Sequence, residues 1–107
     1  WHLMVVKLEV EALTASRFEV IEELKEKGVA PGLHFVPLHL QTLYRPMVDD
    51  PSRLAVATDA FERILSLPLY PDMTDEDVTT VVDALAGVIE RRTRSGAAAR
   101  SAGGGVA

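Results

Sequence analysis

Residues 28–39 read Gly-Val-Ala-Pro-Gly-Leu-His-Phe-Val-Pro-Leu-His, and a second apolar segment, Leu-Ser-Leu-Pro-Leu-Tyr-Pro, occupies residues 65–71. The first segment is rich in apolar residues that favour strands, so we predict a strand over residues 33–40. Pro37 has no N–H to donate to a neighbouring strand, which argues against a central, fully paired position. We therefore expect this strand, which carries His34 and His39, to lie at an edge or beside a cleft.

The segments before this stretch predict a strand and then a helix. Residues 2–10 alternate at period two, and one face is wholly apolar: Met4, Val6, Leu8 and Val10. Ser16 and Glu19 form a capping box that begins a helix, and Gly28 ends it. The helix has a stripe that we expect to be buried, made of Phe18, Val20, Ile21 and Leu24, whereas its charged residues, Glu22, Glu23, Lys25, Glu26 and Lys27, are expected to face water.

Two further helices follow a loop over residues 41–53. Pro51, preceded by two aspartates, begins the second helix, which ends before Pro68 and should direct inward Leu54, Ala57, Phe61, Ile64 and Leu65. We read residues 65–71 as the turn after it. Thr74 caps the third helix, which ends near Arg92 and has the apolar stripe Val78, Val81, Val82, Leu85 and Ile89.

The predicted order of elements, β-α-β-α-α, indicates a two-layer α/β sandwich with its helices on one side of a small sheet. The chain has 107 residues, enough for one domain with one modest core. We expect that domain to span residues 1–93. Residues 94–107 are rich in Ser, Gly, Ala and Arg without periodicity, and we predict a disordered tail there.

Composition and charge bear on the classes of partner and on cellular location. Residues 1–90 contain seven basic and sixteen acidic residues, a formal charge of −9, which would repel a phosphate backbone, so we expect no nucleic-acid partner. No apolar run approaches the roughly 20 residues of a membrane span, and no signal peptide is recognisable. The chain has no cysteine. These features together favour a cytoplasmic protein without a membrane partner.

The residues offer little catalytic material beyond three histidines. A strand with His34 and His39 five positions apart directs them to opposite faces, so a metal site that also uses His2 needs a bend in the chain. His34 is as readily a half-buried structural residue as a functional one, and His39 is more readily structural. Tyr44 and Arg45 could contact a ligand or simply flank a turn. On chemistry alone, the chain lacks a complete active site.

A series of short motifs occurs in a defined order along residues 1–92. They are Trp1-His2-Leu3, Ser16-Arg17, Lys27-Gly28-Val29, Gly32-Leu33-His34-Phe35-Val36-Pro37-Leu38-His39, Tyr44, Leu65-Ser66-Leu67-Pro68-Leu69-Tyr70-Pro71, Met73-Thr74 and Asp77-Val78. As an ordered set they resemble the C-terminal small domain of the DegT/DnrJ/StrS sugar aminotransferases, which are pyridoxal-phosphate enzymes of the aspartate aminotransferase fold, fold type I.

The resemblance implies a C-terminal fragment of an enzyme that transfers an amino group, usually from glutamate, to a keto sugar nucleotide. The lysine that holds pyridoxal 5'-phosphate as a Schiff base would belong to the large catalytic domain, and no lysine here matches its motif. No catalytic residue is therefore assigned, and the fragment alone is expected to be inactive. Members usually form homodimers through the large domain. The segment matching residues 34–39 lies near the active-site cleft, which implies substrate binding by His34, Phe35 and His39.

The start at Trp1 also leads us to expect a piece of a longer protein. Separated from a large domain, such a piece should expose apolar surface on its sheet or its third helix, and should be marginally stable or self-associate. Relatives that do not transaminate carry their distinguishing residues elsewhere. The alternative is a free-standing α/β domain that binds a protein or a nucleotide sugar without chemistry.

Overall fold

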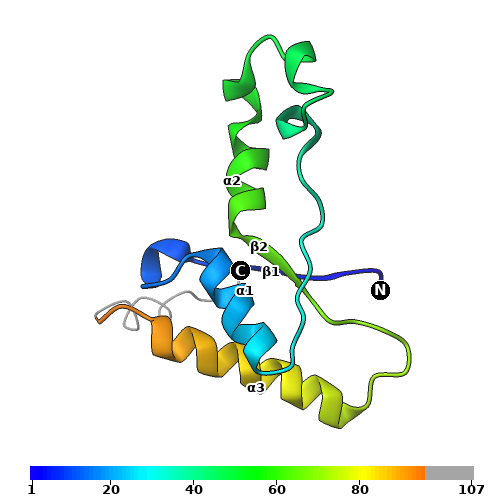
Figure 1. Cartoon of the computed structure of the whole chain (residues 1–107), viewed down its shortest axis with the longest axis vertical. Coiled ribbons are helices and arrows are strands. Elements are labelled where there is room, and N and C mark those ends of the chain that lie inside the picture. The colour runs from blue at the N-terminus through cyan, green and yellow to red at the C-terminus, as the bar shows by residue number, and fades with distance from the viewer. Residues whose placement is uncertain (96–107) are drawn as a thin grey trace, which may run out of the picture.

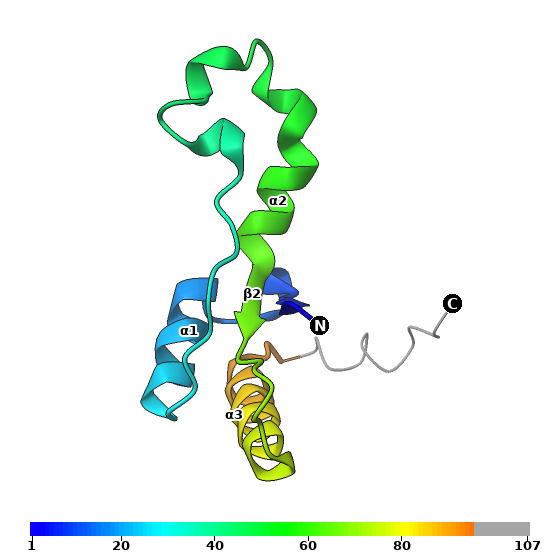
Figure 2. The ribbon, with the colours of Figure 1, turned by 90° about the vertical axis from the view of Figure 1, so that its right-hand side faces the viewer.

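The computed structural model describes residues 1–95 and comprises a body from which an arm projects (Figure 1). The body contains strand β1 (Met4–Lys7), helix α1 (Arg17–Glu26), strand β2 (Ile64–Leu67) and helix α3 (Asp75–Arg92). The arm contains the segment that runs outward from the body and helix α2 (Ala55–Arg63), which runs back alongside it (Figure 2). The radius of gyration is 16.1 Å, compared with about 13 Å for a compact domain of 100 residues. The projecting arm accounts for this excess.

The sheet is formed by two strands that are far apart in the sequence. β1 and β2 pair antiparallel, with Val5 opposite Ser66 and Val6 opposite Leu65. At the other edge of β2, Gly32 and Ser66 exchange two backbone hydrogen bonds of 2.8 Å each. Because side chains alternate along a strand, Val6 and Leu65 share one face of the sheet and Val5 and Ser66 share the other.

The hydrophobic core lies in the body, where α1 and α3 pack against each other and against the sheet. Its buried members are Leu8, Leu13, Ala15, Val20, Ile21, Leu24, Val29, Leu65, Ala84 and Val88. None of them comes from residues 30–64, so the arm contributes nothing to this core. The predicted α/β class is confirmed: a small sheet is covered by helices.

The predicted helix ends are confirmed in atomic detail. Ser16 Oγ accepts from the backbone N–H of Glu19, whose carboxylate accepts from the backbone N–H of Ser16, and Thr74 and Asp77 make the same capping box on α3. Gly28, which follows the end of α1, has a φ of +80°. A residue with a side chain is strained in that left-handed conformation, so the glycine is required by the backbone.

Two predicted elements are wrong. Residues 33–40 do not form a strand: only Gly32 bridges to β2, and Pro37 leads into the short 3₁₀ helix η2 (Leu38–Leu40). Residues 64–67 do not continue the second helix but form β2, because pairing with β1 outweighs the helical pattern of the sequence. The segment that we read as a helix-terminating turn is therefore half strand, and the two strands are antiparallel.

Other differences concern the ends of elements and short helices. β1 is shorter than the predicted span of residues 2–10, because Val10–Ala12 form the 3₁₀ helix η1. The predicted loop holds η3 (Arg45–Met47), and Asp50 caps η4 (Pro51–Leu54), which leads into α2. The predicted tail begins at residue 94, and residues 96–107 lie outside the described part of the chain. Within that part, no helix has the length and apolar character needed to cross a bilayer.

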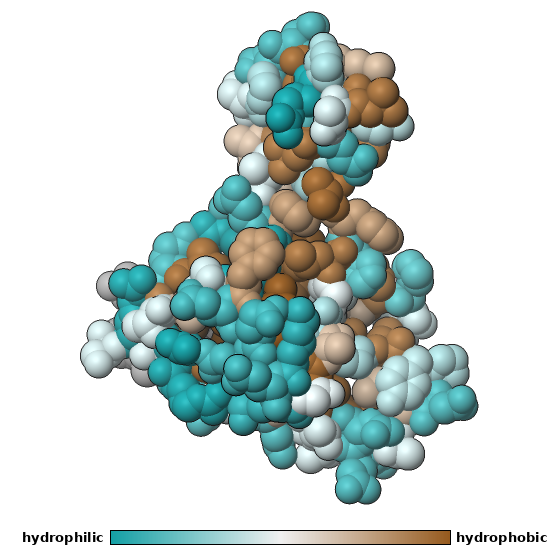
Figure 3. All heavy atoms as spheres, in the orientation of Figure 1, coloured by the Kyte–Doolittle hydropathy of each residue, from teal (hydrophilic) through white to brown (hydrophobic). Residues whose placement is uncertain are grey.

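Several side chains predicted to be buried are exposed. Phe18 is 62 % exposed. Of the predicted stripe on α3, Val81, Leu85 and Ile89 pack against the core, whereas Val78 and Val82 are exposed. The buried residues of α3 are Ala84 and Val88, which the prediction did not include. Met4 and Val5 are exposed on β1. Figure 3 shows further apolar surface over the arm and where the arm meets the body. The exposed apolar surface predicted for the sheet and the third helix is therefore present.

Candidate functional site

A pocket of about 310 Å³ opens beside the end of β2. The bridge between Gly32 and Ser66 brings the segment after α1 against this strand, so that residues distant in sequence line one hollow. Ser66 projects to this side because it lies on the face opposite Leu65. The lining consists of His2, Leu3, Ala30, Gly32, His34, Ser66, Leu67, Pro68 and Leu69.

His34 lies in this pocket and is tightly packed against Gly32. A Cβ atom added at Gly32 would come within 2.5 Å of His34 Cε1, so a glycine is needed for the ring to take this place. His34 Nδ1 is buried and has no hydrogen-bond partner among the described residues. Phe35 meets the His34 ring edge-on, with ring centroids 5.1 Å apart, but is itself 70 % exposed. The structure thus brings together His34 and Phe35, two of the three predicted substrate-binding residues.

His39 lies in the arm and does not line the pocket. Its Nε2 is 2.8 Å from the Oγ1 of Thr58 on α2, and this hydroxyl is also 3.3 Å from the carbonyl oxygen of Leu54, to which it donates. With the Thr58 hydrogen directed to Leu54, His39 Nε2–H is the donor to Thr58. His39 is thereby docked on α2, and its role in substrate binding stays a prediction.

The other residues singled out in the sequence, Tyr44, Arg45 and His2, do not form a second site with His39. Arg45 Nη2 donates to the carbonyl of Leu40 at 2.9 Å, which closes the turn between η2 and η3, and Tyr44 is 38 % exposed beside it. His2 shares the pocket with His34, whereas His39 is elsewhere. Within residues 1–95, no three His, Cys, Asp or Glu side chains are grouped so that they could hold a metal ion.

Sequence reasoning missed Arg17, which is 6 % exposed at the start of α1. Its Nη1 donates to the carbonyl oxygens of Phe61 and Ile64 at the end of α2, the latter at 3.2 Å. The guanidinium carbon lies 5.1 Å from the ring centroid of Phe18 and 4.7 Å from that of Phe61. This explains why Phe18 is exposed: its ring covers the guanidinium group instead of entering the core. Burial lowers the pKa of Arg17, although the group stays charged.

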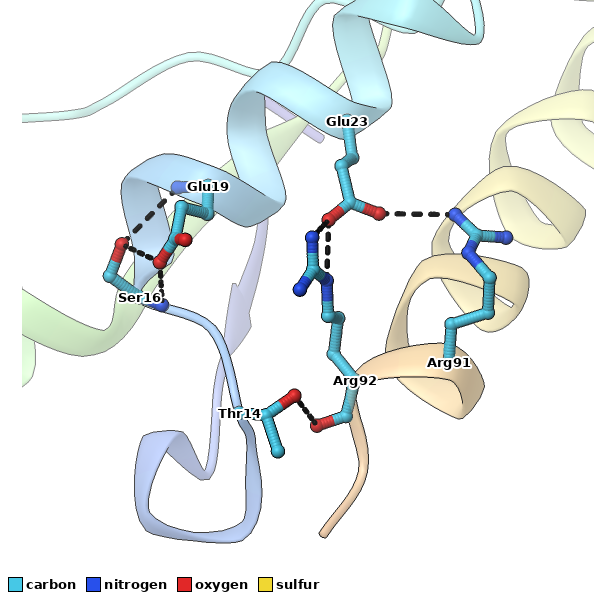
Figure 4. A network of polar contacts seen from close by, with 6 residues as sticks. All are labelled: Thr14, Ser16, Glu19, Glu23, Arg91 and Arg92. Atoms are coloured by element: carbon cyan, nitrogen blue, oxygen red, sulfur yellow. Dashed lines mark hydrogen bonds and ion pairs between the residues drawn. The ribbon is translucent and has the colours of Figure 1, made fainter.

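Glu23 was predicted to face water, but it connects α1 to the end of α3 (Figure 4). Its carboxylate accepts from Arg92 Nε at 2.6 Å and from Arg91 Nη2 at 3.1 Å. These hydrogen bonds, with Arg92 contributing most, lower the pKa of Glu23. Beside them, Thr14 Oγ1 donates to the carbonyl of Arg92 at 3.1 Å. The network holds the helices together without reaching the pocket.

Comparison with known proteins gives a consistent set of relatives. The model of the DegT/DnrJ/EryC1/StrS aminotransferase family matches residues 1–86. The uncharacterized protein MJ1066 of Methanocaldococcus jannaschii is 38 % identical over an alignment 94 residues long. The alignment covers 83 % of this chain and 23 % of that protein.

Solved structures of two proteins resemble this chain in three dimensions. "Putative sugar aminotransferase Spr1654" from Streptococcus pneumoniae, in its PLP-form, aligns with a TM-score of 0.72 and 31 % identity over 84 % of this chain and 23 % of its own; its PMP-form gives the same TM-score. The aminotransferase TlmJ from Streptoalloteichus hindustanus aligns with a TM-score of 0.69 and 27 % identity over 83 % of this chain and 22 % of its own. The chain spans about a quarter of the length of these relatives.

Proposed function

This chain belongs to the DegT/DnrJ/EryC1/StrS aminotransferase family, and we propose that residues 1–93 are the C-terminal small domain of a sugar aminotransferase. The observation that carries the proposal is the alignment with Spr1654, which spans 84 % of this chain but 22 % of that protein. An alignment so complete on one side and so partial on the other is expected for one domain of a larger enzyme. Everything said below of the complete enzyme is part of this proposal.

The cofactor of the complete enzyme is pyridoxal 5'-phosphate, bound through a lysine, and it supplies the chemistry by which the amino group is transferred. Lys7, Lys25 and Lys27 are all exposed, and none lines the pocket beside β2. Lys25 forms an ion pair with Glu22 at 2.8 Å on the outer face of α1. These residues do not fit the cofactor, and we assign its binding to the large catalytic domain. The exposed apolar side chains of β1 and α3 are candidate contacts with that domain.

The substrate of this proposal is a keto sugar nucleotide, which receives an amino group from glutamate. His34 lines the pocket and has a ring nitrogen without a partner in the described residues, and the Phe35 ring packs edge-on against it. We propose that His34, Phe35 and His39 contact the sugar nucleotide when the large domain is present. Phe35 stands where many relatives have tyrosine, so it contributes ring contact and no hydroxyl. The complete enzyme is proposed to be a homodimer.

The direct test is amination by the protein made from the complete coding sequence. We expect glutamate-dependent conversion of a keto sugar nucleotide to the amino sugar nucleotide, followed by mass spectrometry, and an absorbance band of bound pyridoxal phosphate. The present chain should show neither. Cofactor binding without transfer from any amino donor would contradict transamination. Tight binding of a nucleotide sugar by the present chain, encoded alone, would favour the alternative of a free-standing binding domain.

Variants of the complete enzyme test the site itself. Loss of a hydrogen bond to a charged group costs about 1.5–3 kcal/mol, so His34→Ala should raise KM for the sugar nucleotide by about tenfold or more. Phe35→Tyr should leave amination intact, because the added hydroxyl is of a kind that relatives accommodate. Thr42→Ala, at an exposed position of the arm, is the matched control. An unchanged KM in His34→Ala would remove His34 from the proposed site.

A further inference from the structure

Two chain segments join the arm to the body: one leaves the sheet after the Gly32–Ser66 bridge, and the other is the junction of α2 and β2. The core contains no residue of the arm, and no extensive packing joins α2 to α1 or α3. Figures 1 and 2 show the arm rising away from both of those helices. The side-chain contacts between arm and body are found at the junction of α2 and β2.

Arg17 makes this junction from the side of the body. The carbonyl oxygens of Phe61 and Ile64 lie at the end of α2, where carbonyl groups lack partners within the helix and carry partial negative charge. One nitrogen, Nη1, donates to both of them, and the planar, weakly hydrated guanidinium group can at the same time stack on aromatic rings, which a compact, strongly hydrated ammonium does less well. The rings of Phe18 and Phe61 lie within 5.1 Å of it and shield it from water.

Arg63 makes the junction from the side of the arm. As the last residue of α2, it donates through Nη1 to Glu11 Oε2 at 2.6 Å, makes a second hydrogen bond to Glu11, and donates through Nε to Asp59 at 2.7 Å. Its carbonyl oxygen accepts from the N–H of Leu8 at 2.9 Å. Glu11 belongs to η1 of the body, so this side chain connects the two parts in the opposite direction to Arg17.

We propose that Arg17 and Arg63 form a two-arginine clamp that sets the orientation of the arm, and with it the position of His39. Thr58 transmits this position, because it lies on α2 and hydrogen-bonds His39. Both arginines are positioning residues and touch neither pocket nor substrate. The orientation of the arm does not depend on the proposed function, whereas the consequence for His39 as a substrate contact rests on it.

The distance between arm and body measures the clamp directly. The chain has no cysteine, so spin labels can be placed specifically on Thr42→Cys in the arm and Asp83→Cys on α3, both exposed positions. Electron–electron double resonance on the 107-residue chain should give one narrow distance distribution. Arg17→Met should broaden and shift it. Arg17→Lys should restore it only in part, because lysine keeps the charge and can donate to the carbonyls, but its strongly hydrated ammonium lacks the planar face that stacks on the two rings.

A second variant keeps the test decisive if Arg17→Met does not fold. Glu11→Gln leaves the core untouched and weakens only the partner of Arg63, so it should also broaden the distribution while circular dichroism stays unchanged. Arg91→Met, which removes an arginine paired with Glu23 away from the junction, is the control and should keep the narrow distribution. If folded Arg17→Met or Glu11→Gln gives a distance distribution as narrow as that of the parent chain, the proposed clamp is refuted.

Discussion

Two valines of α3 allow a sharp test of how the body is packed. Val88 is fully buried, and Val82 is 54 % exposed. The apolar pattern of the sequence predicted the opposite, with Val82 in the buried stripe and Val88 outside it. Replacement of each by alanine makes the same chemical change in the same helix, so the gain in helix propensity of about 0.5 kcal/mol is common to both variants.

The expected loss of stability differs between them. Removing one buried methylene costs about 0.5–1.5 kcal/mol, so Val88→Ala, which removes two such groups from the core, should cost about 1–3 kcal/mol before that gain. Val82 has less than half of its surface buried, and the transfer contribution of its two groups is then about 0.7 kcal/mol. After the gain in propensity, Val82→Ala should be nearly neutral, and Val88→Ala should be destabilised by about 0.5–2.5 kcal/mol.

Urea unfolding followed by circular dichroism at 222 nm measures this difference. For a domain of this size, 1 kcal/mol corresponds to about 4–8 °C in Tm, so a thermal melt gives an independent reading. The m-values of the two variants should agree with that of the parent, which excludes a change in the unfolded state as the cause. Equal losses, or a larger loss in Val82→Ala, would refute the described packing of α3.

Three further predictions use the same unfolding measurements. Ser16→Ala should lower the free energy of unfolding by about 1 kcal/mol, since it removes the capping box of α1. Gly28→Ala should destabilise the fold by about 1–2 kcal/mol because of the φ of +80°. Gly87→Ala, inside α3 with no atom closer than 3.6 Å to the new Cβ, should stabilise it by about 0.5–1 kcal/mol. Stability changes of the same sign in both variants would contradict the backbone described at Gly28. Hydrogen bonds from Arg63 lower the pKa of Glu11 from 4.5 to about 2, so its contribution is present above pH 4.5 and is lost as the pH falls toward 2; Glu11→Gln should flatten that part of the acid profile, and an unchanged profile would argue against the ion pair.

Local signals in the sequence predicted the ends of helices well. The capping box at Ser16, the cap at Thr74 and the glycine after α1 depend on residues within one turn of each other, and all three are found. The strand at residues 64–67 could not be predicted in this way. Ile64 and Leu65 continue a helical pattern, and only pairing with β1, about 60 residues earlier, makes them a strand.

The sequence predicted which segment contains the candidate site but not how its residues are arranged in space. The family resemblance points to residues 34–39. Of the three predicted residues, only His34 lines the pocket; Phe35 packs edge-on against its ring, and His39 lies on the arm. Arg17 could not have been found from spacing, because its partners are backbone carbonyls 44 and 47 residues away. An arginine beside a helix cap resembles an ordinary surface charge until the fold places a helix end against it.

The two apolar segments, residues 28–39 and 65–71, meet at the bridge between Gly32 and Ser66. The chain leaves the sheet directly after this bridge. Pro37, which cannot donate to a ladder, leads into short turns that satisfy backbone groups, such as Leu40 N–H to the Pro37 carbonyl at 2.9 Å. Such turns satisfy the backbone but bury few side chains, so Phe35, Leu38, Leu43 and Met47 stay exposed. An arm with satisfied backbone groups and uncovered apolar side chains is suited to contact with another folded surface. We propose that this surface, together with the exposed apolar side chains of β1 and α3, contacts the large domain to which the cofactor lysine is assigned.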